Sequence, residues 1–227
     1  MIKGFTTESG RYGLQEVQEA LEETGWYDGY PYPVVMGIMG LLERDTTQVH
    51  VTDITSCLRR AYLQRITDVY PSLKRMYWLF RGALAHQLVE NTREPYSLVE
   101  VRFQRRVDGV TVVGRPDKIV PTRREIYDFK TTRHITLKNL PYGEHATQVN
   151  IYRWLVEPHF QIDRLFLVYL DMSRCASREV PVEDVEEYVT ERARILQGAM
   201  ASGTLPVGEP SWLCDYCEVR DECQTNA

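Results

Sequence analysis

The chain has 227 residues, 43% of them hydrophobic, and a formal net charge of −5. This length and composition suffice for one domain with a sizeable core, alone or with a small appended lobe. The negative charge argues against a protein that coats nucleic acid over its whole surface. No long uncharged apolar run and no apolar leader is present, so we expect a cytoplasmic protein that does not cross a membrane.

Charge is unevenly distributed along the chain. Between Thr55 and Leu140 there are 17 basic and 8 acidic residues, a balance of +9, whereas the remainder holds 10 basic and 24 acidic residues, a balance of −14. A basic middle segment would attract a polyanion, and salt would weaken that binding. A solvated surface with a chance asymmetry of charge is the alternative.

The first fifty residues carry no recognisable chemistry. Apolar residues at helical spacing predict an amphipathic helix from Leu14 to Thr24, ended by Gly25. The segment that follows is rich in aromatic residues, Gly and Pro, and predicts an irregular cover over the core. Its aromatic side chains could stack on bases, although core packing is the commoner role of such residues. They are Trp26, Tyr27, Tyr30 and Tyr32.

Two helices are predicted next. Asp53, Thr55 or Ser56 would cap the first, which presents Cys57 from its first turn beside arginines, a setting that favours the thiolate. The second runs from about Lys74 to Arg93 and carries His86 on its face of small and apolar residues. A histidine there is either a satisfied core residue or a metal ligand.

Three strands should form a meander behind the second helix. Leu98 to Arg106 and Val110 to Val120 flank a strong Asp-Gly turn signal, and Glu125 to Thr131 follows. Gly114 and Pro116 predict a bend just before Asp117.

The stretch from Gly114 to Thr132 carries the strongest chemical pattern. Residues two apart on a strand share a face, so Asp128 and Lys130 project together while Tyr127 and Phe129 turn into apolar packing. Asp117 and Asp128 could hold a hard divalent cation, and Lys130 could stabilise charge on a phosphate under attack. The pattern also fits a solvated hairpin with an incidental salt bridge.

Three more elements follow. A helix from Glu144 to Val156 places Gln148 and Tyr152 four residues apart on one face, where they could hold a phosphate, a water or a base, or simply be surface polar residues. The continuous apolar run from Asp163 to Asp171 predicts a strand buried on both faces. A long amphipathic helix is expected from Val180 to Gly203.

Three late cysteines, Cys214, Cys217 and Cys223, predict a metal site. A tetrahedral sulfur site needs a fourth ligand. Of the two other cysteines we choose Cys57 for its thiolate-favouring setting, because Cys175 lies in an expected irregular turn. From spacing alone, zinc and iron–sulfur both remain open.

These motifs, taken in order, resemble those of a known family. They are TSCLRRAYL, GALAHQLVE, GRPD, YDFKTT, QVNIY and the final cysteines, from Thr55 to Cys223. The chain resembles the RecB-like branch of the PD-(D/E)XK nucleases, most closely the CRISPR-associated exonucleases of Cas family four. The resemblance implies an α/β, restriction-endonuclease-like fold with a central mixed sheet flanked by helices. Asp128 stands where many relatives use glutamate.

The resemblance also implies cofactors and roles. Mg or Mn would be held by His86, Asp117, Asp128 and the Phe129 carbonyl, with Lys130, Gln148 and Tyr152 completing the catalytic set. Cys57, Cys214, Cys217 and Cys223 would hold an iron–sulfur cluster, with the four-iron form favoured and a two-iron form or zinc as alternatives.

The expected activity is that of a DNA exonuclease on single strands that also trims overhangs. Its task would be spacer-precursor processing in CRISPR adaptation, beside the integrase complex and compatible with an oligomer. A recombination or repair nuclease, and a non-catalytic iron–sulfur DNA-binding subunit, are the alternatives. We expect a cover over 1–50, a nuclease core over 51–205 and a cysteine segment over 206–227 that packs with Cys57, all in one compact unit.

Overall fold

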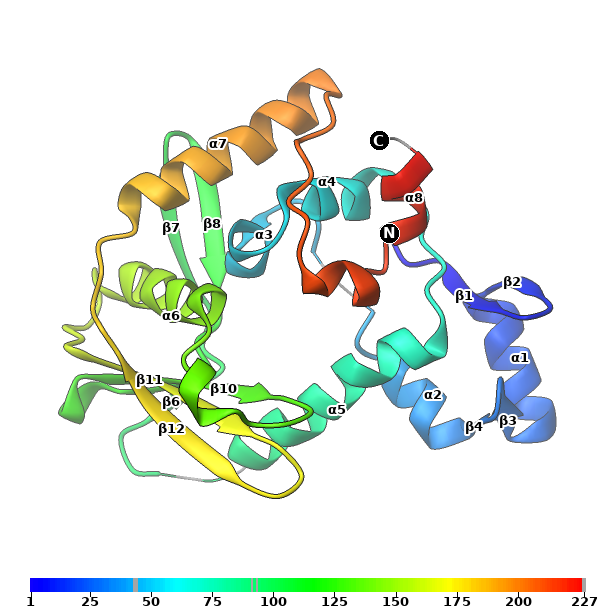
Figure 1. The fold of residues 1–227 in the computed structure, drawn as a ribbon, viewed down its shortest axis with the longest axis horizontal. Coiled ribbons are helices and arrows are strands. Elements are labelled where there is room, and N and C mark those ends of the chain that lie inside the picture. Colours follow the sequence, from blue (N-terminus) through cyan, green and yellow to red (C-terminus); the bar gives the residue numbers. More distant parts are fainter. Residues whose placement is uncertain (43–44, 91, 93, 226–227) are drawn as a thin grey trace. The chain divides into compact units, whose positions relative to one another are not determined.

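The computed structural model describes residues 1–42, 45–90, 92 and 94–225 (Figure 1). The chain forms two compact units, and each is built from separate stretches of sequence. The first unit comprises Met1–Thr46, Cys57–Ala83 and Gly203–Ala227. The second comprises Thr47–Ser56 and Leu84–Ser202.

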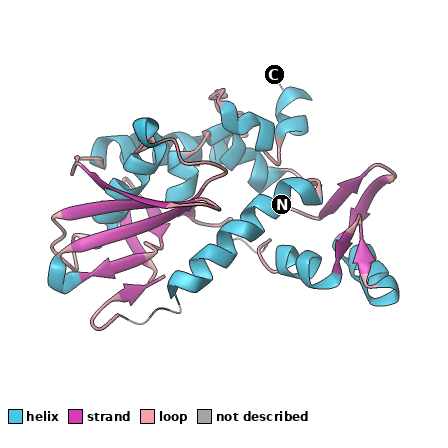
Figure 2. Ribbon diagram, turned by 60° about the horizontal axis from the view of Figure 1, so that its bottom comes forward, coloured by secondary structure: helices cyan, strands magenta, loops and turns pink. Residues whose placement is uncertain are grey.

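A five-stranded mixed sheet forms the centre of the second unit, in the order β12-β11-β10-β9-β6 (Figure 2). β10 pairs in parallel with β11, and the other neighbours are antiparallel. This mixed sheet flanked by helices is the architecture expected from the sequence. Its strands are β6 (Leu98–Val99), β9 (Lys118–Val120), β10 (Glu125–Thr131), β11 (Arg164–Leu170) and β12 (Cys175–Val180).

A second, three-stranded sheet has the order β5-β8-β7, with β5 (Val49–His50), β7 (Phe103–Val107) and β8 (Val110–Gly114). Asp108 and Gly109 join β7 to β8, and both have positive φ, 45° and 81°, as an Asp-Gly hairpin turn allows. The three predicted strands pair in succession, as in a meander: β7 with β8, β6 with β9, and β9 with β10. The two long strands expected around this turn are not continuous, however, and the chain passes from one sheet to the other at residues 100–102 and 115–117.

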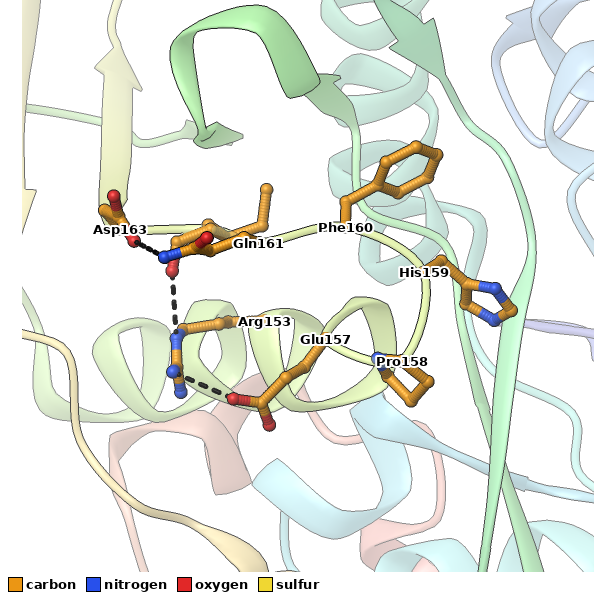
Figure 3. A pocket seen from close by; sticks show the side chains of 8 residues that line it. Arg153, Glu157, Pro158, His159, Phe160, Gln161 and Asp163 are labelled. Atoms are coloured by element: carbon orange, nitrogen blue, oxygen red, sulfur yellow. Dashed lines mark hydrogen bonds and ion pairs between the residues drawn. The ribbon is translucent and has the colours of Figure 1, made fainter.

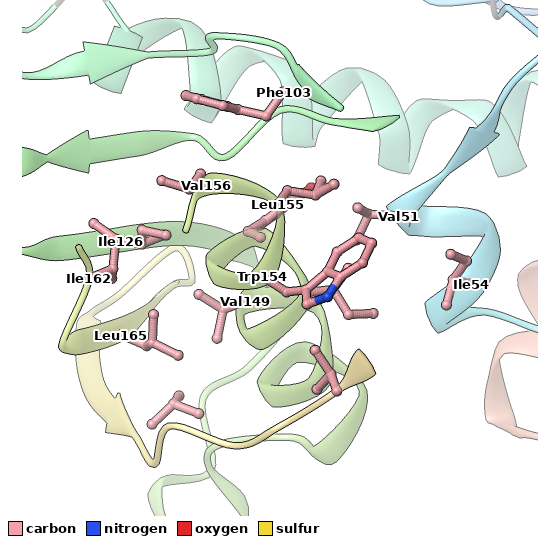
Figure 4. Packing of buried hydrophobic residues seen from close by; sticks show 14 of the residues in the cluster. Val51, Ile54, Phe103, Ile126, Val149, Trp154, Leu155, Val156, Ile162 and Leu165 are labelled. Carbon is pink, nitrogen blue, oxygen red and sulfur yellow. The ribbon is translucent and has the colours of Figure 1, made fainter. Parts of the chain in front are cut away.

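Helix α6 (Gly143–Val156) contacts strands of both sheets and the short helix α3 (Val51–Thr55). Its residues from Gln148 to Tyr152 are all buried, and the apolar ones join the core shown in Figure 4. Gly114 is required here, because a Cβ atom would lie under 3 Å from atoms of Val51, Tyr152 and Leu155. The chain is thus drawn tightly against α6 just before Asp117.

The end of the second unit differs from expectation. Residues 175–180 form strand β12, so Cys175 begins a strand instead of lying in an irregular turn. The long helix, α7, starts later than predicted and spans Glu186–Ser202, ending before Gly203 with φ 70°. β11 is buried on one face more than on the other. Two short 3-10 helices, η1 (Pro121–Arg123) and η2 (Leu137–Asn139), lie in this unit.

The first unit begins with two hairpins around a helix. β1 (Gly4–Thr7) pairs with β2 (Gly10–Gly13), and β3 (Trp26–Tyr27) pairs with β4 (Tyr30–Pro31). Helix α1 (Leu14–Thr24) ends at Gly25 with φ 76°, as predicted. Part of the expected irregular cover is instead the apolar helix α2 (Tyr32–Met39), which packs into a small core with Val17, Leu21 and Leu73.

The remaining helices of the first unit carry the cysteines. Cys57 is the N-cap of α4 (Leu58–Ile66) and therefore precedes the first turn in which it was expected. Asp53 caps α3 instead, accepting a hydrogen bond from the backbone of His50 (2.8 Å). Element η3 (Trp212–Tyr216) contains Cys214 and is capped at its end by Cys217, and α8 (Arg220–Thr225) contains Cys223.

Helix α5 (Leu73–Glu90) begins in the first unit and ends in the second. Its predicted end at Arg93 lies outside the described residues. None of the described helices is both long and apolar enough to cross a membrane.

Candidate active site

Asp117 lies in the second unit at the point where the chain enters the five-stranded sheet. Its carboxylate accepts a hydrogen bond from the backbone N–H of Phe129 (2.6 Å) and lies 3.4 Å from Nδ1 of His86. The side chain is 9% exposed, so it is fixed between a strand and α5. The sequence places these residues far apart, and the fold brings all three together.

Asp128 and Lys130 project from the same face of β10, the middle strand, as the two-residue spacing predicts. The Lys130 ammonium lies 2.8 Å from Oδ2 of Asp128, yet this oxygen has no well-directed hydrogen-bond donor among the described residues. Burial raises the pKa of Asp128 to about 6, Lys130 opposes the rise, and the neighbouring Asp117 carboxylate adds to it. The two residues form an ion pair in which Asp128 is buried and Lys130 is partly exposed.

A chain of polar contacts leads from Lys130 to α6. The ammonium donates to Oε1 of Gln148 (2.9 Å), and Nε2 of Gln148 donates to the hydroxyl of Tyr152 (2.9 Å). Burial raises the pKa of Tyr152 well above its usual range, so the phenol stays neutral. Because Gln148 and Tyr152 are buried against the sheet, they are not the surface polar residues that the sequence left open.

Glu100 is a residue that the sequence analysis missed. His86, Glu100 and Asp117 each offer one ligand atom, and these three atoms lie within 4.8 Å of one another. A hydrogen bond to Asp117 raises the pKa of His86. Glu100 has φ 51°, a strained conformation of the kind found at functional sites. The signal available in the sequence was an acid between Val99 and Val101, inside an apolar run.

These side chains suit a hard divalent cation. Three carboxylates and an imidazole supply the oxygen and nitrogen ligands that such ions take. Oδ2 of Asp128 is buried without a well-directed hydrogen-bond donor in the described part of the chain, and the Asp117 carboxylate repels its negative charge. A bound cation would offset both effects. We conclude that the residues fit Mg or Mn. The Phe129 carbonyl as a further ligand stays a prediction.

The four cysteines predicted to hold a cofactor all lie in the first unit. Sγ of Cys57 accepts the backbone N–H of Glu209 (3.4 Å), and Sγ of Cys214 accepts that of Ser211 (3.4 Å). Among the described residues, no three of the cysteine sulfurs lie within 4.8 Å of one another. Cys175 is exposed on β12, in the other unit.

Two cavities of the second unit lie away from these residues. One of about 340 Å³ lies at the end of α6 and is lined by Arg153 and residues 157–163 (Figure 3). Arg153 is already bonded to the carbonyl of Ile162 (3.3 Å) and to Glu157 (3.1 Å). A neighbouring cavity of about 330 Å³ shares Arg153 and Glu157. Neither contains a predicted site residue.

Comparison with family models matches residues 80–224, more than half of the chain, to the PD-(D/E)XK nuclease superfamily. The chain belongs to the PD-(D/E)XK nuclease superfamily. The matched range includes His86, Glu100, Asp117, Asp128 and Lys130. Membership supports a metal-dependent nuclease with DNA as substrate, and it confirms the superfamily part of the resemblance.

One solved structure agrees at the level of the fold, and a second is a weaker match. The crystal structure of SSO0001 is 22% identical, covers 86% of this PD-(D/E)XK chain and 96% of its own, and superimposes with a TM-score of 0.66. A phage-related exonuclease from Haemophilus somnus 129PT is 14% identical and covers 82% and 89%, with a TM-score of 0.39. Comparison with curated proteins gives no match.

Proposed function

We propose that this chain is a Mg- or Mn-dependent DNA exonuclease that acts on single strands and trims overhangs. The observation that carries the proposal is the continuous set of contacts from Asp128 through Lys130 and Gln148 to Tyr152. Beside it lies the group of His86, Glu100 and Asp117. A divalent ion bound there supplies Lewis acidity, which activates a water and neutralises charge on a phosphate.

Lys130 has the central role among the protein's own side chains. Its side chain is 18% exposed and its ammonium already lies beside Asp128, so it can approach a phosphate oxygen without leaving that carboxylate. Gln148 fixes the direction of that ammonium, and Tyr152 in turn fixes the amide of Gln148. Gln148 and Tyr152 therefore orient Lys130 and, through it, the DNA backbone.

We also propose an iron–sulfur cluster held by Cys57, Cys214, Cys217 and Cys223, in the four-iron form favoured by the resemblance. When bound, such a cluster supplies stability, because it links segments far apart in sequence. The two segments are already joined. Leu58 donates to Glu209 (3.2 Å), and Arg60 makes an ion pair with Glu218 (2.9 Å).

Further contacts continue this link between α4 and the late segment. Arg59 donates to the carbonyl of Pro206 (2.8 Å) and lies 4.0 Å from Sγ of Cys223, and Arg75 donates to the carbonyl of Cys217 (3.2 Å). These contacts hold the two segments that carry the four cysteines against each other, which supports a shared metal site.

The biological setting we propose is the trimming of fragments before their integration into a CRISPR array, in the cytoplasm and beside the integrase complex. It is supported by the motif order, which resembles Cas family four. A recombination or repair nuclease of the same fold would have the same active site. The genes that neighbour this one therefore decide between the CRISPR role and the repair role.

The decisive experiment compares Lys130→Ala and Asp117→Asn with Lys138→Ala, a control on an exposed lysine of η2. Cleavage of end-labelled single-stranded and duplex DNA is measured in Mg, Mn and chelator, with circular dichroism as the test of folding. We expect both site variants to lose cleavage while folded, and the control to retain it. Full activity of Lys130→Ala, or of wild type in chelator, would leave only a DNA-binding module.

A further inference from the structure

One face of α5 in the first unit exposes aromatic rings between two cations. Lys74, Tyr77, Trp78 and Arg81 follow the spacing i, i+3, i+4 and i+7, so they lie along one side of the helix. Tyr77 is 40% and Trp78 is 36% exposed. An amphipathic helix normally turns such rings inward, so this face requires an explanation other than core packing.

Neighbouring side chains hold these rings in place at the surface. The guanidinium carbon of Arg81 lies 4.4 Å from the ring centroid of Trp78. Tyr216 of η3, itself 48% exposed, meets Trp78 edge to face at 6.2 Å. Tyr77 contacts Tyr30 with centroids 6.3 Å apart. We call Lys74, Tyr77, Trp78, Arg81 and Tyr216 the aromatic stripe.

The charges around the aromatic stripe suit an anionic ligand. Lys74 is exposed at one end, and Arg81 lies over Trp78 at the other. Asp215, next to Tyr216, is neutralised by Arg220 at 2.8 Å. Exposed rings flanked by cations suit a ligand with flat, unpaired faces and a negative backbone.

We propose that the aromatic stripe binds single-stranded DNA by stacking bases on Trp78 and Tyr216 while Lys74 and Arg81 contact phosphates. Bases of a duplex are already stacked and paired, so the stripe selects single strands. The inference rests on the proposed function, because it assigns a second contact for the same substrate. It concerns residues of the first unit, whereas the candidate active site lies in the second.

The test measures binding in chelator, where cleavage does not interfere. Fluorescence anisotropy follows a labelled thymidine oligonucleotide and an abasic oligonucleotide of equal length, with wild type, Trp78→Phe, Trp78→Leu and Tyr216→Leu. Leu79→Ala is the control, since Leu79 is an exposed apolar neighbour outside the stripe. Leucine keeps apolar bulk without a stacking ring, and thermal melting confirms that each variant is folded.

We expect Trp78→Leu and Tyr216→Leu each to weaken thymidine binding about tenfold and to leave abasic binding unchanged. Trp78→Phe and Leu79→Ala should bind like wild type. Equal affinities for thymidine DNA in Trp78→Leu and wild type would overturn the proposal. An equal loss of affinity for abasic DNA would also overturn it. So would a change in the sedimentation coefficient of the leucine variants, because this would show that the aromatic stripe lies in an interface between copies of the chain. Lys130→Ala tests cleavage separately, so a failed nuclease assignment and a failed stripe are distinguishable.

Discussion

The backbone N–H of Glu100 donates a hydrogen bond to the backbone carbonyl of Asp117, at 3.2 Å. Each residue lies where the chain passes between the two sheets of the second unit, Glu100 between β6 and β7 and Asp117 between β8 and β9. The bond therefore joins the two crossing points. Both carboxylates consequently lie beside His86, at the junction between the β6–β9 pair and the β7–β8 pair.

Glu100→Gln should impair metal binding with little effect on folding. The amide keeps the shape of the side chain but removes a negative charge from the group with His86 and Asp117. We expect the Mn concentration for half-maximal cleavage to rise at least about tenfold. Metal titrations of activity measure this change. An unaltered titration would exclude Glu100 from the site.

Glycine and alanine at position 100 should differ in stability. Glu100 has φ 51°, which is costly for any residue with a Cβ atom and free of strain for glycine. Both substitutions remove the carboxylate, so the difference between their free energies of unfolding reports the backbone strain at position 100. We expect Glu100→Gly to unfold at higher denaturant than Glu100→Ala, by about 1 kcal/mol. If Glu100→Ala were the more stable variant, the backbone at position 100 would not be strained.

Asp128→Asn should stabilise the protein when metal is removed. Burial raises the pKa of Asp128 to about 6, so the folded state favours the protonated acid. The stability this group contributes is complete below its unfolded pKa near 4 and is lost as pH rises through 6. In chelator at pH 7.5 we expect the variant to gain about 1–3 kcal/mol over wild type, and at pH 4 to gain little. Added Mn should raise the melting temperature of wild type more than that of Asp128→Asn.

Half-buried His145 should make the fold sensitive to mild acid. Burial and, to a smaller extent, Lys130 lower its pKa to about 3, and its Nδ1 lies 3.1 Å from the Tyr169 hydroxyl. Stability from a lowered pKa is present above the unfolded value of 6.5 and is lost as pH falls. Between pH 7.5 and 5, wild type should lose about 2 kcal/mol relative to His145→Asn. His159→Asn, on an exposed histidine, should behave like wild type in the same urea titrations.

The cysteine assignment predicts one colour test. Protein purified without oxygen should be brown, and alanine at Cys57, Cys214, Cys217 or Cys223 should bleach it and lower its melting temperature. Cys175→Ala should keep the colour, because Cys175 is exposed on β12 in the other unit. Stoichiometric zinc without iron would refute the cluster, and a bleached Cys175 variant beside a coloured Cys57 variant would reassign the fourth ligand.

Local patterns in the sequence predicted local geometry well. The pairing of Asp128 with Lys130 follows from the period of a strand, and the end of α1 follows from Gly25 in a left-handed conformation. Both depend only on neighbours in sequence. The hydrogen bond between Gln148 and Tyr152 likewise agrees with their predicted spacing of four residues on one face of α6.

The parts that failed depend on distant partners. The breaks at Glu100 and Asp117 arise because one part of each predicted strand pairs in the five-stranded sheet and the other part in the three-stranded sheet. No local sequence pattern predicts this division. The start of strand β12 was predicted to be an irregular turn, since only pairing with β11 reveals the strand. The Gly and Pro residues of the segment after Gly25 predicted irregular structure, yet α2 forms there. The helix forms because its apolar side chains pack into the core around Val17, and this packing outweighs the low helix propensity of Gly and Pro.

The interleaved order of the two units has a consequence for synthesis. A ribosome delivers every stretch of the second unit once residue 202 has emerged, whereas the first unit still lacks its final segment, Gly203–Ala227. Until then Arg60 has no Glu218 and the backbone N–H of Leu58 has no Glu209. The unit that begins the chain is thus the last to be completed, and during translation its helices stay open to chaperones for longer than those of the second unit.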